Sequence, residues 1–161
     1  MHPSLKTFLL ACPLLLLSLF LATACGGKAA ERYTLEELPE EQLVFSFGGG
    51  FSGQYQEYML LPNGQVFHRR KVINELPFRP YTDVDSKEAR DLFATYRKLD
   101  FAALNYDEPG DMTYTIIHTR GDQSSTLTWG GPNTNPTEEL RSYWRRAMQL
   151  LGDTEPLPAS E

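Results

Sequence analysis

Few side chains in this sequence have the types and spacing that catalysis or metal binding requires. Asp107, Glu108 and Asp111 form a short acidic group whose carboxylates suit calcium, and His118 follows seven residues later. These four residues would have to surround one pocket to form a hydrolytic or metal site. His68 and His118 have neither the i, i+4 spacing nor the C-x-x-C partners of a typical metal site. A small hydrolase or a metal-binding protein stays an alternative, while no catalytic residue, metal or cofactor is predicted.

The glycine-rich stretch, residues 47–58, is the most unusual local feature. Four of the six residues at positions 48–53 are glycine, which tolerates φ > 0 and close backbone approach. The stretch lacks the lysine of a P-loop, and a strand rather than a helix is predicted to follow it, so a nucleotide site is not expected. Ser52 does not fit the G-x-S-x-G pattern of hydrolases, because Gln54 stands where the second glycine would be. We interpret the stretch as a flexible, exposed binding loop.

Aromatic and basic residues near this loop are candidates for contact with a protein partner. An exposed Phe51 would be a hot-spot type of anchor. Residues 69–71 are the only local basic run in an acidic chain, and Trp129 precedes two glycines at a predicted strand end. Charges on a strand also protect a sheet edge, which is the alternative interpretation of Arg69 and Arg70. The predicted contact residues are Phe47, Gly49, Gly50, Phe51, Ser52, Gly53, Arg69, Arg70 and Trp129.

The elements that would position these residues follow from hydrophobic periodicity. Strands are predicted at residues 43–47, 54–61, 66–71, 112–119 and 124–129, with an irregular connection at 72–82. Asn63-Gly64 predicts a hairpin with a type I′ turn. Asp85 with Glu88, and Asn135 with Glu138, have the spacing of capping boxes that begin helices. Pro136 is expected at the first helical position of the second helix, and Gly152 at its end.

Each helix has one apolar stripe and each hairpin one apolar face, and these must cover one another. The expected fold is a two-layer α+β domain, with an antiparallel sheet of about five strands covered by two amphipathic helices in the order β-ββα-ββα. The predicted boundaries are 1–24 for a cleaved signal peptide, 25–41 for a lipidated cysteine and flexible tether, 42–152 for the domain, and 153–161 for a disordered tail.

Residues 1–24 have the organisation of an export signal. A short start with Lys6 precedes an apolar segment that has five leucines between Leu14 and Leu19, and small residues follow it. Even from Phe8 to Ala24 the apolar segment has 17 residues and is interrupted by Pro13, whereas a spanning helix needs about 20. Cleavage after Ala24 is therefore favoured over a permanent membrane helix.

Residues 21–25, Leu-Ala-Thr-Ala-Cys, resemble the lipobox of bacterial lipoproteins, except that leucine lies one place further from the cysteine than usual. The resemblance implies acylation of Cys25 and attachment to a membrane through the acyl chains. An ordinary A-x-A cleavage site at the same bond is the alternative. Gly26, rather than aspartate, follows the cysteine, which is similar to the pattern of outer-membrane lipoproteins. The expected location is the cell envelope, with the outer membrane favoured over the inner.

The net charge and the cysteine content further limit the kinds of protein that this chain could be. The chain has 15 basic and 21 acidic residues; Lys6 lies in the signal, which leaves 14 against 21, a net charge of −7. This balance opposes nucleic-acid binding, which needs a basic surface. Cys12 also lies in the signal, so Cys25 would be the single cysteine of the mature chain and no intrachain disulfide is expected.

Two family resemblances follow from these residues. The chain resembles small bacterial lipoproteins that have a G-G-G-F-[ST]-G motif. The motif corresponds to residues 48–53, and as in those proteins a strand, an Asn-Gly turn and another strand follow it. More faintly, the order resembles emfourin-type inhibitors of thermolysin-like metalloproteases. The matching segments are residues 49–53, 92–104, 111–114 and 140–151. The first resemblance implies a bacterial lipoprotein, from a group that is mostly uncharacterised, and the second implies metalloprotease inhibition as an alternative function. From the loop and the predicted anchor we expect a non-enzymatic envelope protein that binds a protein partner.

Overall fold

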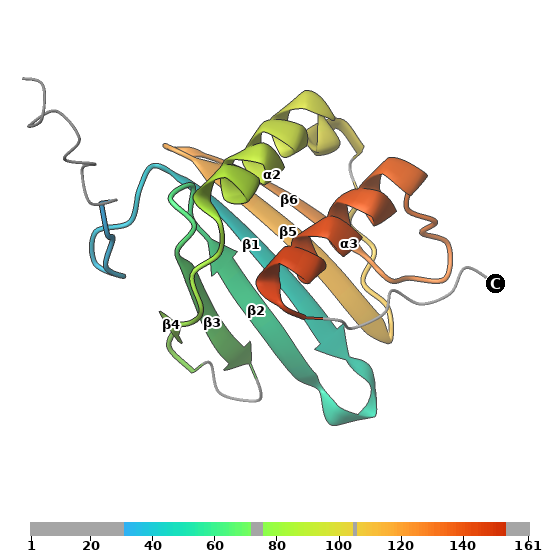
Figure 1. The fold of residues 1–161 in the computed structure, drawn as a ribbon. Helices are drawn as coiled ribbons and strands as arrows, with labels where there is room; N and C mark the ends of the chain where they lie inside the picture. Colours follow the sequence, from blue (N-terminus) through green and yellow to red (C-terminus); the bar gives the residue numbers. More distant parts are fainter. Residues whose placement is uncertain (1–30, 72–75, 105, 154–161) are drawn as a thin grey trace, which may run out of the picture. The chain divides into compact units, whose positions relative to one another are not determined.

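The computed structural model describes residues 31–71, 76–104 and 106–153 (Figure 1). The predicted signal peptide and Cys25 lie outside the described residues, as does most of the predicted tail. The folded domain begins at Arg32.

Six antiparallel strands form one sheet in the order β4-β3-β2-β1-β5-β6 (Figure 1). Five of them lie where the sequence predicts strands, and the α+β class is confirmed. The sixth, β4, lies in the stretch predicted to be irregular and pairs with β3 through Phe67 and His68. The strands are β1 (Glu41–Gly49), β2 (Gln54–Leu60), β3 (Val66–Lys71), β4 (Arg79–Pro80), β5 (Met112–Arg120) and β6 (Gln123–Trp129).

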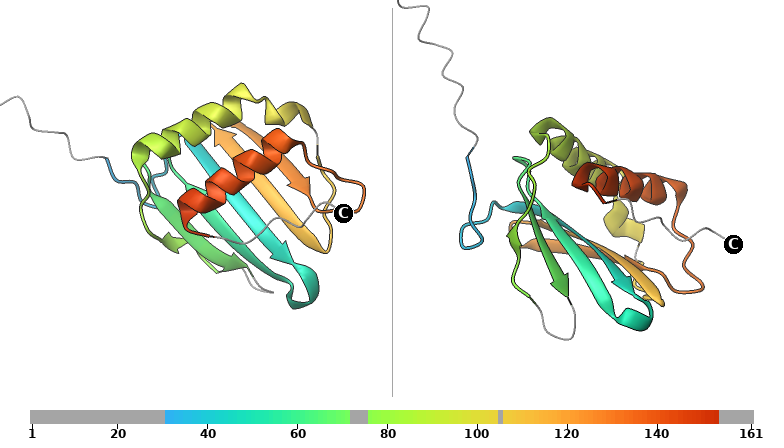
Figure 2. Two further views of the ribbon diagram at one scale, coloured as in Figure 1. Left: turned by 45° about the vertical axis from the view of Figure 1, so that its right-hand side comes forward. Right: turned by 60° about the horizontal axis from the view of Figure 1, so that its bottom comes forward.

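Two helices, α2 (Ser86–Lys98) and α3 (Glu138–Leu151), cover the same face of the sheet (Figure 2). The Asp85 side chain caps α2 as predicted, because its Oδ1 accepts hydrogen bonds from the Lys87 and Glu88 amides at 2.9 Å. The predicted start of α3 is wrong by two residues. Thr137, not Asn135, is the N-cap, and its hydroxyl accepts a bond from the Leu140 amide. Pro136 therefore precedes the cap instead of occupying the first helical position.

The indole of Trp144 on α3 is the centre of the core between the helices and the sheet. Four aromatic rings of the sheet meet it edge-on, at centroid distances of 5.2 to 6.2 Å. These rings belong to Phe45, Phe47, Tyr114 and Trp129. Each such pair contributes about 0.5–1.5 kcal/mol beyond the burial of its area. The position of α3 on the sheet is therefore tied to these four rings.

The opposite face of the sheet carries a second, smaller apolar cluster of Met59, Leu61 and Phe67. Tyr33 and Leu38 pack against it from the segment that precedes β1. Residues 32–38, predicted as part of a flexible tether, thus contact the domain.

Polar contacts hold this segment in place. The Tyr33 amide donates a hydrogen bond to Gln65 Oε1 at 2.7 Å, and Gln65 Nε2 donates one to the Tyr33 carbonyl at 3.1 Å. Arg32 forms an ion pair with Asp83 at 2.6 Å. The segment is therefore attached beside the turn that joins β2 to β3.

That turn has a different geometry from the predicted type I′ turn. The Leu61 amide donates to the Gln65 carbonyl at 2.9 Å and the Gly64 amide to the Leu61 carbonyl at 3.0 Å, which makes a three-residue loop. Gly64 has φ +91°, whereas no positive φ occurs at Asn63. A positive φ at one position, following a tighter turn, is the usual form of a three-residue hairpin loop. The Gly64 carbonyl also accepts a bond from Val84, just before α2.

Both edges of the sheet are partly covered. At one edge β4 has two residues, of which Pro80 has no N–H to offer another strand. At the other edge the Thr128 amide donates to the Tyr106 carbonyl at 2.9 Å, and the Glu108 amide donates to the Thr128 carbonyl at 3.1 Å. Short edge strands and covering loops are the common ways to block unwanted strand pairing.

The close contact at Gly64 predicts unequal effects of two glycine substitutions. Gly121→Ala costs about 1 kcal/mol, because Gly121 has φ +57° and open space around it. Gly64→Ala costs a further 1–3 kcal/mol or so, because a Cβ there collides with the Val84 carbonyl oxygen. Urea unfolding of the two variants measures the difference. Equal losses would contradict the contact between the turn and the residues before α2.

Candidate functional site

The hairpin of β1 and β2 ends in the single 3-10 turn η2 (Gly50–Ser52), followed by Gly53. We call residues 50–53 the Phe51 loop. The Gly53 amide donates to the Gly50 carbonyl at 3.2 Å, and Gly53 has φ +59°. The Ser52 hydroxyl donates to the Gly49 carbonyl and accepts from the Gln54 amide, each at 3.3 Å. The loop is therefore closed by its own hydrogen bonds.

The glycines that precede the loop are required by close backbone contacts. A Cβ on Gly48 would collide with the Gln54 carbonyl oxygen, and one on Gly49 with the Asp111 carbonyl oxygen. The Asp111 carbonyl also accepts a hydrogen bond from the Gly50 amide at 2.5 Å. The sequence predicts a flexible bend here, whereas the structure has a bend fixed against the start of β5.

Phe51 lies at the tip of this fixed bend and is fully exposed. The next most exposed large apolar side chain among the described residues, Leu76, is 48% exposed. An aromatic side chain on a backbone that is already ordered loses little entropy on binding, which is the usual property of an interface anchor. The predicted exposure of Phe51, Ser52, Gly50 and Gly53 agrees with the structure.

Two of the predicted contact residues are wrong as surface anchors. Phe47 is 4% exposed and Trp129 is 2% exposed, and both rings contact Trp144. Strand alternation explains Phe47, since Phe45 and Phe47 face the helices together. Trp129 stacks on Tyr114 across the β5–β6 pair at 5.7 Å, so the glycines that follow it do not place it on the surface.

The basic residues of β3 divide between the two faces of the sheet, as alternation predicts. Arg69 forms an ion pair with Glu57, which is 8% exposed, and its guanidinium lies 4.4 Å from the centre of the Phe78 ring. Arg69 thus has contacts within the fold, and its role in partner binding stays a prediction. Arg70 is exposed on the helix side, beside Gln56 of β2, and stays a candidate.

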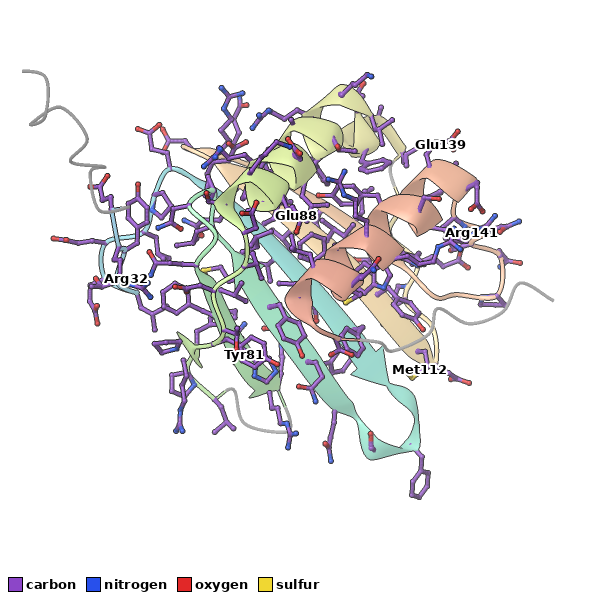
Figure 3. The ribbon with its side chains drawn as sticks, viewed as in Figure 1. Arg32, Tyr81, Glu88, Met112, Glu139 and Arg141 are labelled. Atoms are coloured by element: carbon purple, nitrogen blue, oxygen red, sulfur yellow. The ribbon has the colours of Figure 1, made fainter. Side chains whose placement is uncertain are left out.

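A cluster that the sequence analysis missed adjoins Arg70 on the helix side. The rings of Tyr58, His68 and Tyr81 lie within 5.6 Å of one another (Figure 3 labels Tyr81). The Tyr58 hydroxyl donates to Asp153 Oδ2 at 2.8 Å, so Asp153, predicted to be in the disordered tail, belongs to the domain. Burial raises the pKa of Tyr58, and the Asp153 carboxylate raises it further.

Burial also lowers the pKa of His68, and the positive charge of Arg70 lowers it further. His68 Nε2 lies 2.8 Å from Gln56 Oε1. The cluster is thus a set of neutral rings bordered by one cation and one anion. The observed register pairs Tyr58 with His68. The predicted two-residue turn would have paired Tyr58 with Arg69 instead, so the sequence did not bring the two rings together.

His118 belongs to a different group. Its Nε2 lies 2.9 Å from Glu41 Oε1, to which Arg97 also donates at 2.5 Å. A cavity of about 670 Å³ lies beside His118. Its lining residues are Tyr96, Arg97, Asp100, Phe101, His118, Arg120, Asp122, Gln123, Ser124 and Ser125.

The three carboxylates considered with His118 take no part in this cavity. Glu108 accepts hydrogen bonds from the Thr134 hydroxyl at 2.6 Å and from Asn133 at 3.2 Å, which hold the connection to α3. Asp107 forms a bridge with Thr128, and Asp111 precedes β5, while His118 lies near the other end of that strand. The structure does not bring the four residues around one pocket.

Within the described ranges, no three His, Cys, Asp or Glu side chains are placed to share a metal ion. Nor does any described helix have the length and apolar character needed to cross a bilayer. A scan against models of protein families and a search of curated proteins found no match to the chain.

The Glu41 cluster predicts a specific acid sensitivity. Burial opposes ionisation of Glu41, but hydrogen bonds from Arg97 and His118 outweigh it, so the pKa of Glu41 lies below its ordinary 4.5. Because the folded-state pKa is the lower one, this stabilisation is present above the unfolded-state pKa and is lost as pH falls through the folded-state pKa.

Glu41→Gln should therefore lower the free energy of unfolding at neutral pH by about 1 kcal/mol. Its stability should also fall less steeply than that of the wild type below about pH 4.5. Chemical unfolding over a pH series measures this, with the exposed Glu36→Gln as the matched control. Parallel pH profiles for wild type and Glu41→Gln would refute it.

Proposed function

We propose that this protein is a lipid-anchored, non-enzymatic binding domain of the bacterial cell envelope, and that the Phe51 loop contacts a protein partner. The observation that carries the proposal is a fully exposed phenylalanine on a backbone fixed by hydrogen bonds. An exposed aromatic side chain has no stabilising role in its own fold, whereas in a partner's pocket its burial contributes about 1.5–3 kcal/mol.

The backbone around Phe51 supports this role. Three side-chain or backbone bonds close the loop, and the Gly50–Asp111 bond joins it to β5. A loop that is ordered before binding loses less conformational entropy in the complex. Arg70 is exposed and is a basic residue near the loop. In the proposed complex it would contact acidic residues around the partner's pocket.

The proposed cellular location is inferred from the N-terminal sequence. Cys25 follows an apolar segment and small residues, and the acyl chains on it would hold the protein in a membrane, the outer membrane in preference to the inner. The acidic balance of the mature chain gives no support for attachment through surface charge or for a nucleic-acid partner.

Inhibition of a secreted metalloprotease is the alternative function. It is favoured by the fixed loop that presents one large apolar side chain, since protease clefts bind rigid, exposed segments of their inhibitors. A small hydrolase or metal-binding protein receives less support, because His118 and the three acidic residues belong to separate groups of contacts.

Removal of the Phe51 ring should abolish capture of the partner without loss of stability. Residues 25–161 are immobilised and exposed to a periplasmic extract, and bound proteins are identified by mass spectrometry. Phe51→Ala should lose the specific partner, a loss of at least tenfold, because a central aromatic anchor contributes about 2 kcal/mol or more.

Leu99→Ala is the matched control, because Leu99 is also an exposed apolar residue, at 37%, but belongs to the end of α2. A thermolysin-like metalloprotease, assayed in parallel, separates the inhibitor alternative from other partners. Equal recovery with wild type, Phe51→Ala and Leu99→Ala would rule out the loop as the binding element.

The proposed anchor has its own test. The full chain produced in a bacterium should partition into the detergent phase, with a mature N-terminus at Cys25 that carries the mass of acyl chains. Cys25→Ser should partition into the aqueous phase. If Cys25 of the mature protein carries no acyl chain, the proposed anchor is wrong and the domain is secreted without a lipid anchor.

A further inference from the structure

We infer that the cavity beside His118 is a second binding site, which takes a small, neutral, polyhydroxylated ligand such as a mono- or disaccharide. The inference goes beyond the proposed function, because it depends neither on the anchor at Cys25 nor on the Phe51 loop. It rests on the polar side chains that surround the cavity and on the hydrogen bonds that hold its deepest part in place.

The cavity forms because the helix side of the β5–β6 hairpin changes from apolar to polar toward its turn. Successive cross-strand pairs on that side are Tyr114 with Trp129, Ile116 with Leu127, His118 with Ser125, and Arg120 with Gln123. The first two pairs belong to the core, whereas the last two line the cavity. The opposite wall comes from the last turn of α2 and the residues after it: Tyr96, Arg97, Asp100 and Phe101. The space is therefore bounded mostly by polar groups instead of being filled by apolar side chains.

The three most buried lining residues, Tyr96, Phe101 and His118, form the floor of the cavity. The Tyr96 hydroxyl lies 3.1 Å from the Ser125 hydroxyl, and the centres of the Tyr96 and His118 rings are 4.7 Å apart. The Glu41 carboxylate lies 2.9 Å from His118 Nε2, on the same oxygen that accepts a hydrogen bond from Arg97. Groups that are ordered before binding lose little conformational entropy when a ligand arrives.

Unused hydrogen-bonding groups surround this floor. Within the part of the chain that the structure describes, the side chains of Asp100, Arg120, Asp122 and Gln123 are exposed and have no hydrogen bond or ion pair to another residue. The guanidinium only donates hydrogen bonds, the two carboxylates only accept them, and the amide does both. The rim of the cavity therefore offers donors and acceptors together.

This mixture of groups indicates the class of ligand. The lining contains two arginines and two aspartates, so their charges cancel, and Arg97 already pairs with Glu41. A phosphate or carboxylate would be placed among acidic side chains as well as basic ones. An apolar molecule would find little surface, because Tyr96 and Phe101 are only 3% and 2% exposed.

A saccharide suits such a lining, because each of its hydroxyls can both donate and accept a hydrogen bond. The volume of the cavity, about 670 Å³, also lies within the range of about 300–1,000 Å³ that is usual for small-molecule sites.

An NMR titration of isotope-labelled protein tests the site. Residues 25–161, which contain the compact unit that begins at Arg32, are produced with Cys25→Ser. The protein is titrated with disaccharides of glucose, galactose, mannose and N-acetylglucosamine, and separately with inorganic phosphate and with glutamate. At least one disaccharide should shift the amide signals of residues 96–101 and 118–125 in a saturable way, whereas phosphate and glutamate should not.

Variants of the rim assign the shifts to the cavity. Arg120→Ala and Gln123→Ala should each weaken binding of that disaccharide about fivefold, since each removes a hydrogen-bonding partner. Both residues are exposed, and the spectrum of each variant shows directly whether the fold is kept. Arg90→Ala is the matched control, because Arg90 is also exposed but lies outside the cavity lining, and it should bind as the wild type does.

Stronger shifts of these amides with phosphate or glutamate than with any disaccharide would assign the cavity to an anion and overturn the inference. The absence of a saturable shift with every disaccharide would also overturn it, as would equal affinities of the Arg90→Ala and Arg120→Ala variants. None of these outcomes affects capture of a protein by Phe51, which the loop variant tests separately.

Discussion

The contact of Trp144 with four aromatic rings of the sheet is the interaction on which the rest of the domain depends. It fixes α3 over β1, β5 and β6. It also decides which side chains of β1 face inward, because Phe45 and Phe47 must both meet the indole. The chain has to reverse soon after Phe47 in order to form β2 on the same sheet. Phe51, at the point of reversal, has no neighbour left to cover it.

The reversal also explains the glycines. In a hairpin between two paired strands, the backbone of Gly48 and Gly49 approaches the carbonyls of Gln54 and Asp111 too closely for any Cβ. Close packing therefore requires glycine at positions 48 and 49, whereas Gly50 and Gly53 have room for a Cβ and a positive φ that favours glycine. The same contacts that exclude side chains from this part of the hairpin hold the one large side chain at its tip in a defined position.

Much of the fold is determined by local sequence patterns, whereas much of the candidate site is not. The hairpin at Asn63-Gly64, the cap at Asp85 and the stop at Gly152 depend on residues close together in the chain, and they are found where predicted. Burial of Trp129 depends on Tyr114 and Trp144, which are distant in sequence, so the flanking glycines gave the wrong prediction. The contact of Arg69 with Glu57 likewise required the strand register. Attachment of Tyr33 depended on Gln65, a residue without any apolar signal.

The partly covered edges of the sheet have a consequence for a protein confined to a surface. Molecules attached to a bilayer meet one another far more often than the same number in solution, and exposed strands would then join neighbouring copies into fibrils. Here β4, which contains Pro80, covers part of one edge by pairing with Phe67 and His68, and the bonds of Thr128 with residues 106 and 108 occupy part of the other. If the domain is anchored in a membrane as proposed, these covered parts of the two edges would oppose strand pairing between neighbouring copies.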